Sequence, residues 1–245
     1  MIMFCLLRKA EERNIAMEVN QFMNDEVCLE IWGDFASFNP PFAKVERLTY
    51  PVPTPSAVRG ILSAIYAKPL EFRWQVNQIE VLNPIRYMSF LRNEVKSTIS
   101  MKSDPAKSIL YTDEDRTQRQ TQVLKDVRYR ITARICPRPE YTGSLEQLHC
   151  QAMRRIRGGK AFMQPGLGMR EFVCYFEESD GSRKPIDVSM DLGLMVYDVF
   201  DPQDYQVHKD VQPKLSLYHA VMEHGVIRVP DYDSDEVLKG GMAIC

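Results

Sequence analysis

Apolar and polar residues alternate in several segments of the chain. Residues 27–35 (V-C-L-E-I-W-G-D-F) show this alternation, which is typical of a half-buried strand. Residues 72–95 have the same character and are interrupted by an Asn-Pro pair, so two strands are expected there. Residues 127–135 alternate again, with one apolar and one basic face. The basic face consists of Arg128, Arg130 and Arg134.

A helical period predicts two helices. The first covers residues 55–68, with Thr54 as its N-cap, Pro55 at the first helical position and another proline after its end. The second covers residues 145–157, begins after Ser144 and ends at a pair of glycines.

A last strand at 171–178 completes the order strand, helix, two strands, strand, helix, strand. Apart from one additional strand, this is the order of a ferredoxin-like split βαβ unit, so the sequence predicts an α+β fold. Further along, residues 188–200, 207–208 and 226–229 are short strand candidates, and 218–223 is a possible helix. These elements indicate a small C-terminal antiparallel β subdomain.

The chain divides into four predicted parts. Residues 1–23 are an N-terminal extension, 24–180 the ferredoxin-like domain and 181–230 the β subdomain. The acidic segment 231–245 is predicted to be a mobile tail.

The composition is that of a folded globular protein, with 44% hydrophobic and 26% charged residues. No stretch approaches the roughly 18–20 apolar residues that a membrane span requires. The six cysteines include no C-x-x-C pair, and the four histidines have no paired metal-binding spacing. We therefore expect no metal site, no cofactor and a reducing cytoplasm as the location.

Positive charge is concentrated in one part of the chain. The net charge is −2, yet residues 116–160 hold eleven Lys and Arg against three acids, a local +8 that leaves −10 elsewhere. Such a region can supply the phosphate contacts on which nucleic-acid affinity depends. A solvated basic face without a ligand is an equally open interpretation from charge alone.

The densest candidate cluster combines cations with glycines. Glycine allows a backbone to approach a phosphate closely, and guanidinium groups form paired hydrogen bonds with its oxygens. A helix C-cap with favourable dipole charges explains the first part of the cluster without a ligand, but leaves Gly166, Gly168 and Arg170 unexplained. The predicted phosphate contacts are Arg154, Arg155, Arg157, Gly158, Gly159, Lys160 and Arg170.

Familiar catalytic motifs are absent. Gly158-Gly159-Lys160 lacks the preceding glycine and the following Ser or Thr of a nucleotide-binding P-loop. Asp231, Asp233 and Asp235 lack the glycine and the closing glutamate of a calcium loop. No G-x-S-x-G elbow of an esterase occurs.

Three blocks together carry a family resemblance. They are W-G-D-F-A-S-F with K-V-E-R-L-T-Y-P-V-P-T-P-S-A-V-R-G-I-L (32–38 and 44–62), V-L-N-P-I-R with R-N-E-V (81–86 and 92–95), and Q-R-Q-T-Q-V-L-K-D-V-R-Y (118–129). Residues 162–172 and 191–195 extend the match. The chain resembles the fifth CRISPR-associated family (Cas-five), subtype I-C variety, of the repeat-associated RAMP superfamily.

This resemblance implies a ferredoxin-like domain that binds the repeat-derived 5′ handle of guide RNA (crRNA) within a type I-C Cascade surveillance complex. It also implies cleavage of the precursor hairpin without metal, through attack of the 2′-hydroxyl on the adjacent phosphorus. That reaction needs a proton acceptor, a cation for the developing charge and a donor to the leaving oxygen. The implied partners are the RNA and the backbone and large subunits of the complex.

The family's catalytic tyrosine matches Tyr50, and its Lys-His pair aligns with Arg119 and Gln120. Arg119 can neutralise charge, whereas Gln120 cannot transfer protons. Lys44 and Lys125 are possible substitutes, and Arg47 and Arg59 are further expected RNA contacts. Without the resemblance Tyr50 would be interpreted as a packing residue at a strand end. With a pKa near ~10, a tyrosine positions or donates rather than deprotonates.

Two other functions stay open at this point. A non-catalytic subunit that caps the guide RNA fits the missing histidine. A structural subunit without RNA contact would leave the basic region without a role.

Overall fold

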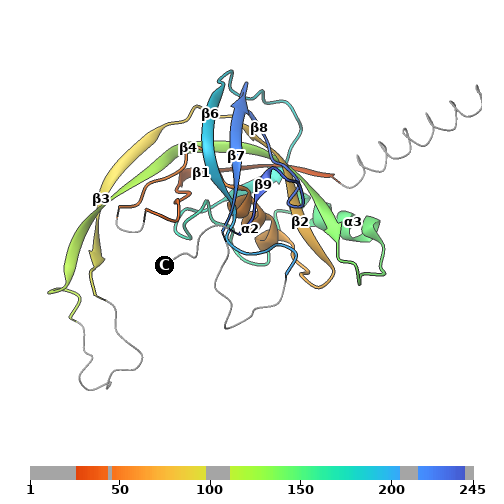
Figure 1. Ribbon diagram of the computed structural model, residues 1–245, viewed down its shortest axis with the longest axis horizontal. Coiled ribbons are helices and arrows are strands. Elements are labelled where there is room, and N and C mark those ends of the chain that lie inside the picture. The colour runs from red at the N-terminus through yellow and green to blue at the C-terminus, as the bar shows by residue number, and fades with distance from the viewer. Residues whose placement is uncertain (1–25, 44–45, 98–110, 205–214, 241–245) are drawn as a thin grey trace, which may run out of the picture.

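The computed structural model describes residues 26–43, 46–97, 111–204 and 215–240. These residues form one nine-stranded sheet and two helices, so the predicted α+β class is confirmed (Figure 1). The predicted extension 1–23, Lys44 and the strand candidate 207–208 lie outside the described residues.

The strands follow the order β5-β1-β4-β2-β8-β7-β6, with β3 paired to β4 and β9 paired to β7. Every pairing between these strands is antiparallel. The elements are β1 (Glu26–Ala36), α2 (Pro55–Ile65), β2 (Phe72–Val81), β3 (Tyr87–Val95), β4 (Arg116–Pro137), α3 (Leu145–Arg157), β5 (Tyr175–Glu178), β6 (Met190–Asp198), β7 (Ser216–Glu223), β8 (Val226–Arg228) and β9 (Val237–Leu238).

The 22 residues of β4 serve two parts of the sheet. Residues 124–134 pair with β1 and residues 129–137 with β2, whereas residues 116–123 pair with β3 as their only strand partner in the described chain. The two parts meet at Leu124, close to Asp126, which has φ 53° and is skipped in the register with β1. Figure 1 shows β3 and the first part of β4 extending away from the body as a ribbon, which we call the arm.

The arm extends the predicted strand 127–135 toward the N-terminus. Strand β4 begins at Arg116, eleven residues before the start of the predicted strand. Residues 116–120 of the arm alternate between exposed and half-buried positions, because the buried positions of β4 begin only at Thr121. The hydrophobic signal that identifies a half-buried strand is therefore missing there.

Both helices occur where the sequence predicts them. Thr54 caps α2 by accepting a hydrogen bond from the Ala57 amide (3.2 Å), and Ser144 caps α3 in the same way. Helix α2 ends at Ile65, three residues earlier than predicted, because Tyr66 is extended and its ring packs on Phe72. Within the described part of the chain, neither helix is long and apolar enough to cross a membrane.

The predicted helix at 218–223 is wrong, since these residues belong to β7. Tyr218, Ala220 and Met222 are buried and the residues between them are exposed, which is the two-residue period of a strand. Strand β8 pairs with β2, so the C-terminal strands continue the same sheet.

The described part of the predicted tail, residues 231–240, packs against the protein. Tyr232 and Val237 are buried, and β9 pairs with β7. The carboxylate of Asp231 forms an ion pair with Arg134 on β4. Apolar burial and this ion pair hold the segment in place, which differs from the mobility that its acidic composition predicted.

Candidate active site and nucleic-acid interface

The segment that precedes α2 is bound to the base of the arm. The Arg47 amide donates to the Gln120 carbonyl (3.2 Å), and the Gln122 amide donates to the Arg47 carbonyl (2.8 Å). Further along, the Tyr50 amide donates to the Phe38 carbonyl at the end of β1 (2.9 Å). These bonds place the predicted catalytic Tyr50 three residues from the contact with β4.

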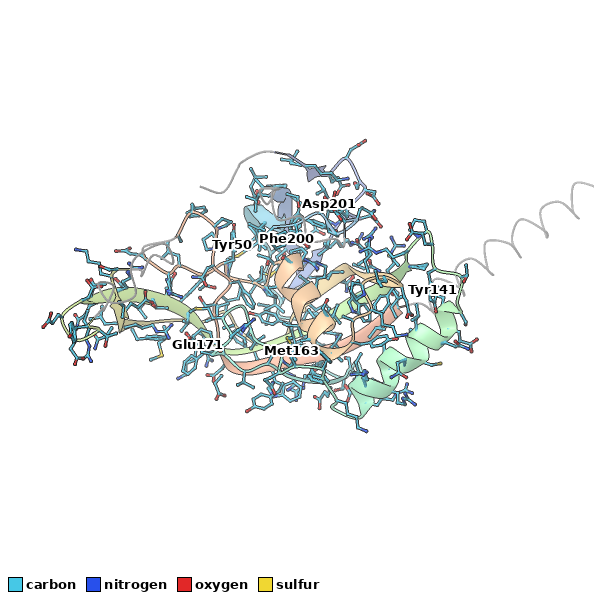
Figure 2. All side chains as sticks on the ribbon, turned by 90° about the horizontal axis from the view of Figure 1, so that it is seen from below. Tyr50, Tyr141, Met163, Glu171, Phe200 and Asp201 are labelled. Carbon is cyan, nitrogen blue, oxygen red and sulfur yellow. The ribbon has the colours of Figure 1, made fainter. Side chains whose placement is uncertain are left out.

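The side chain of Tyr50 is half-buried and packs against the core. Burial raises the pKa of its hydroxyl above the ordinary value, and a backbone hydrogen bond with Val196 of β6 partly offsets this effect. Tyr50 therefore remains protonated at neutral pH and can donate a proton but cannot accept one. Figure 2 shows it on the same side of the molecule as Phe200, which follows β6.

Two of the predicted functional cations share one carboxylate. Arg47 and Arg119 approach the two oxygens of Glu94 on β3, at 2.9 and 3.5 Å. Next to them, Arg92 forms a paired contact with Glu171. This set of side chains positions guanidinium groups between the arm and the body of the protein.

Gln120 projects from the other face of the arm. Adjacent residues of a strand point to opposite faces, and Gln120 lies opposite Leu91 in the register whereas Arg119 lies opposite Arg92. The structure therefore joins the Arg119 and Arg47 guanidinium groups at Glu94 and places the Gln120 side chain on the opposite face of the arm. Gln120 is exposed.

This region offers charge neutralisation and a proton donor. The described histidines lie on other elements: His149 on α3, His219 on β7 and His224 in the turn after β7. Among the described residues, no group of three or more His, Cys, Asp or Glu side chains is arranged to hold a metal ion.

The glycine segment 162–172 packs tightly against β1. The Ser37 amide donates to the Leu167 carbonyl (3.0 Å), and Leu167 is fully buried. Gly168 has φ +82°, and a Cβ there would lie 1.9 Å from the Ser37 carbonyl oxygen. Close backbone packing explains Gly168 without a phosphate. Arg170 in this segment is exposed.

A basic hollow lies at the C-terminal end of α3. No ion pair with a described carboxylate involves Arg154, Arg155 or Lys160, so no carboxylate neutralises these charges, although the Arg155 guanidinium donates to the Ile65 carbonyl (3.2 Å) and lies over the Tyr66 ring. Arg157 differs, because it pairs with Glu178 through two hydrogen bonds (2.7 and 2.8 Å). Gly158 is the helix C-cap. The hollow is lined by Gln151, Arg154, Arg155, Gly159, Lys160 and Ala161.

Phe162 and Met163 follow the hollow and are exposed, although both amides donate to the Ala64 carbonyl near the end of α2. Tyr50 precedes the opposite end of the same helix. The basic hollow and the Tyr50 region therefore lie at opposite ends of α2 (Figure 2).

The basic face predicted for β4 is neutralised by acidic residues of neighbouring strands. Arg128 contacts Glu30 and Glu177, and Arg130 contacts Glu30 and Glu80. Glu30 is buried, so these ion pairs form a cross-strand network rather than a free phosphate-binding surface. Carboxylates from neighbouring strands therefore neutralise part of the net charge of +8 that residues 116–160 carry in the sequence.

Arg59 and Lys125 have different environments. The Arg59 guanidinium binds both oxygens of Asp198 on β6 (2.7 and 2.9 Å), and Asp198 is 1% exposed. This ion pair connects α2 to the C-terminal strands, so the guanidinium for which an RNA contact is predicted is already bound to a carboxylate. Lys125 is exposed, and its side chain has no ion pair with a described carboxylate.

Comparison with known proteins places the chain in a family. Residues 26–230 match the family model described as CRISPR-associated protein (Cas_Cas5), of the Cas5d type. The chain belongs to this family. A relative from Mannheimia succiniciproducens named CRISPR pre-crRNA endoribonuclease Cas5d is 37% identical over 233 residues, which cover 88% of this chain and 99% of the relative.

A second Cas5d relative, from Thermus thermophilus, carries the same name and is 40% identical over 176 residues, covering 72% of this chain and 74% of its own. The fold is similar to two crystal structures. One is a functionally uncharacterized protein, SMU1763c from Streptococcus mutans (TM-score 0.60, 23% identity), and the other is a CRISPR-associated protein (TM-score 0.61, 22% identity). The alignments cover 87% of this chain and 96% of each structure.

In this Cas5d-family chain, sequence reasoning missed Glu94 and Asp198. Glu94 lies in the R-N-E-V block that carries the resemblance, two residues after Arg92, and this strand spacing places both side chains on one face. Asp198 has no comparable signal, because its partner Arg59 is 139 residues away.

Proposed function

We propose that this Cas5d-family protein is an endoribonuclease that cleaves precursor crRNA within the repeat hairpin and retains the 5′ handle in a type I-C Cascade complex. The observation that carries the proposal is the 37% identity, over 99% of its length, to a relative named as a pre-crRNA endoribonuclease. The proposed partners are the repeat hairpin, the mature handle and the backbone and large subunits.

The proposed domain organisation is a ferredoxin-like domain at 24–180 with a C-terminal β subdomain at 181–230. Its support is the strand order β5-β1-β4-β2, in which β4 lies antiparallel between β1 and β2, with α2 and α3 as the connecting helices. Strand β3 is the additional element. The described cysteines are free thiols, which fits the proposed cytoplasmic location.

In the proposed reaction the 2′-oxygen attacks the adjacent phosphorus, the bond to the 5′-oxygen breaks, and a 2′,3′-cyclic phosphate and a 5′-hydroxyl result. Arg47 and Arg119 are suited to stabilise the phosphorane charge, because both guanidinium groups lie at one point of the arm. The protonated Tyr50 is suited to donate to the leaving 5′-oxygen. The proton of the 2′-hydroxyl passes to solvent.

RNA binding is proposed for the cations that lack carboxylate partners among the described residues. Arg154, Arg155 and Lys160 surround the basic hollow, and Lys125 and Arg170 are exposed elsewhere. Free cations of this kind release counterions when they contact phosphates, which supplies affinity without sequence preference.

The decisive experiment incubates the purified protein with its repeat hairpin in EDTA. We expect cleavage with a cyclic phosphate and a 5′-hydroxyl terminus, and no cleavage when the nucleotide at the cut carries a 2′-deoxyribose. Equal cleavage of the deoxy substrate would contradict the 2′-hydroxyl mechanism.

A non-catalytic handle-binding subunit is the second candidate function. The specific observation in its favour is Gln120, which stands where the resemblance implies a histidine and which faces away from Arg119. Tight hairpin binding without cleavage, unchanged by Tyr50→Phe, would select this function.

A further inference from the structure

Three side chains form a continuous row on the face of the sheet opposite the helices. Trp32 on β1 lies directly opposite Arg128 on β4 in the register, and directly opposite Tyr175 on β5. The Arg128 guanidinium lies 4.4 Å from the centroid of a Trp32 ring. The Trp32 and Tyr175 rings are stacked, with centroids 6.0 Å apart and an interplanar angle of 27°. The row is therefore a preformed cation–π and aromatic stack.

The row ends at an open edge. Strand β5 is the last strand of the sheet in the described chain, so no further strand pairs beyond Tyr175. Tyr175 is 53% exposed. Its ring is available for one more flat π system to continue the stack.

This row faces away from the helices. On β1 and β5, the residues that alternate with the row point toward the core: Ile31 is fully buried, and Phe176 packs against the core cluster. Helix α3 contacts β5 and β1 and binds Glu178 through Arg157. A ligand on the row would meet neither helix.

The charges around the row are balanced. Arg128 donates to Glu30 and Glu177, Arg130 pairs with Glu30 and Glu80, and Arg183 approaches Glu30 at 3.4 Å. Three cations therefore face three carboxylates. A ligand attracted here would be held by ring stacking rather than by net charge.

We infer that Trp32 and Tyr175 form a nucleobase-stacking platform for an unpaired nucleotide of the bound RNA. This inference rests on the proposed RNA-binding function and adds a third contact surface, distinct from the basic hollow and from the Tyr50 region. Single-stranded bases stack on aromatic side chains presented by a β-sheet, and this contact tolerates any base because every base has a π face. The exposed edge of the row allows a base to enter without displacement of Arg128.

Intrinsic fluorescence gives a direct test. The chain has two tryptophans, and Trp74 is buried in the core with its indole Nε1 donating to the Tyr66 carbonyl (2.8 Å). A Trp74→Phe variant therefore reports Trp32 alone. We expect the repeat hairpin with its single-stranded flanks to quench this emission, and an abasic substitution at one flanking position to remove the quenching. Unchanged emission at saturating hairpin would overturn the inference.

Affinity at several salt concentrations gives an independent test. We expect Tyr175→Leu to weaken hairpin binding roughly 5- to 100-fold, by the same factor at low and high salt, and Tyr175→Trp to retain affinity. The matched control is Leu194→Ala, an exposed residue of β6 at the other edge of the sheet. An unchanged affinity of Tyr175→Leu would contradict the platform, as would a loss that Leu194→Ala shares.

The outcomes separate this inference from the proposed function. Cleavage and binding without Trp32 quenching would overturn the platform and leave the endoribonuclease proposal intact. Failure of the hairpin and of unstructured RNA to bind would overturn both. A protein segment bound at the β5 edge would instead quench Trp32 when a partner subunit, but not RNA, is added, which also contradicts the platform.

Discussion

Tyr50 and Gly168 are held by their backbones in the part of the chain that carries the family resemblance. The Tyr50 amide donates a hydrogen bond to the Phe38 carbonyl just after β1. Gly168 lies against the carbonyl of Ser37, the residue before Phe38. The two residues have different requirements. A hydroxyl distinguishes Tyr50 from other residues that could pack there, whereas Gly168 is required by backbone geometry.

Tyr50→Phe tests the proton donor. The ring would still pack but its hydrogen bond with the Val196 backbone would be lost, so we expect a loss of only about 1 kcal/mol of unfolding free energy and a cleavage rate lower by about 100-fold or more. Because burial raises the pKa of Tyr50, the hydroxyl stays protonated through the neutral range. The ratio of wild-type to variant rates should therefore stay constant from about pH 6 to pH 9 and decline only above about pH 10. A ratio that rises with pH in the neutral range would indicate a general base instead.

Gly168→Ala tests the close backbone approach. The added Cβ would lie 1.9 Å from the Ser37 oxygen in a residue with φ +82°, so we expect destabilisation of roughly 2–4 kcal/mol in urea unfolding. The control is Gly193→Ala, where φ is +69° and nothing lies within 4 Å, and where only about 1–2 kcal/mol of backbone strain is expected. Equal losses of unfolding free energy at both positions would show that backbone strain alone accounts for the effect of Gly168→Ala.

At the scale of elements, ion pairs join segments that are distant in sequence. Arg59 connects α2 to β6 through Asp198, and Arg134 connects β4 to the acidic C-terminal segment through Asp231. The same residues appear in the sequence as free charges. Their pairing shows why a basic strand face or a basic helix residue does not by itself indicate a nucleic-acid contact.

Arg59→Met tests this structural role. The change would leave the buried Asp198 carboxylate without its partner, and we expect a loss of about 2 kcal/mol of unfolding free energy, since the Arg59 side chain is 30% exposed. Adding Asp198→Asn should recover part of the loss, and the salt dependence of RNA binding should not change. A reduced salt slope in Arg59→Met would restore Arg59 to the RNA contacts.

At the scale of the whole molecule, the fold redistributes the positive charge of residues 116–160. The carboxylates that neutralise Arg128, Arg130 and Arg157 come from strands β1, β2 and β5. Three cations that have no ion pair with a described carboxylate, Arg154, Arg155 and Lys160, surround one hollow at the end of α3, and Lys125 is exposed on β4.

A double variant, Arg154→Ala with Lys160→Ala, tests this redistribution. We expect weaker hairpin binding and a fall of about 1.5 in the slope of log affinity against log salt, because two phosphate contacts are lost. The control with the same net charge change is Arg116→Ala with Arg157→Ala, whose cations already pair with Asp113 and Glu178. Equal slopes for the two double variants would indicate a diffuse charge effect and contradict a site at the hollow.

The sequence by itself determined the elements whose signals are local. Both helices were predicted from three local signals: the N-caps Thr54 and Ser144, the periodic apolar positions that follow each cap, and the proline or glycine after each helix. Alternation predicted β1 and the central part of β4, because a strand with one buried face shows a period of two. The sequence blocks around Tyr50 indicated the family by their resemblance to it.

The tertiary structure decided everything that depends on distant partners. It showed that β7 is a strand, that Arg119 and Gln120 face opposite sides of the arm, and that the basic face of β4 is neutralised. The physical reason is common to these cases. Pairing between strands and between charges depends on spatial neighbours from other parts of the chain, and no local pattern specifies which residues those neighbours are.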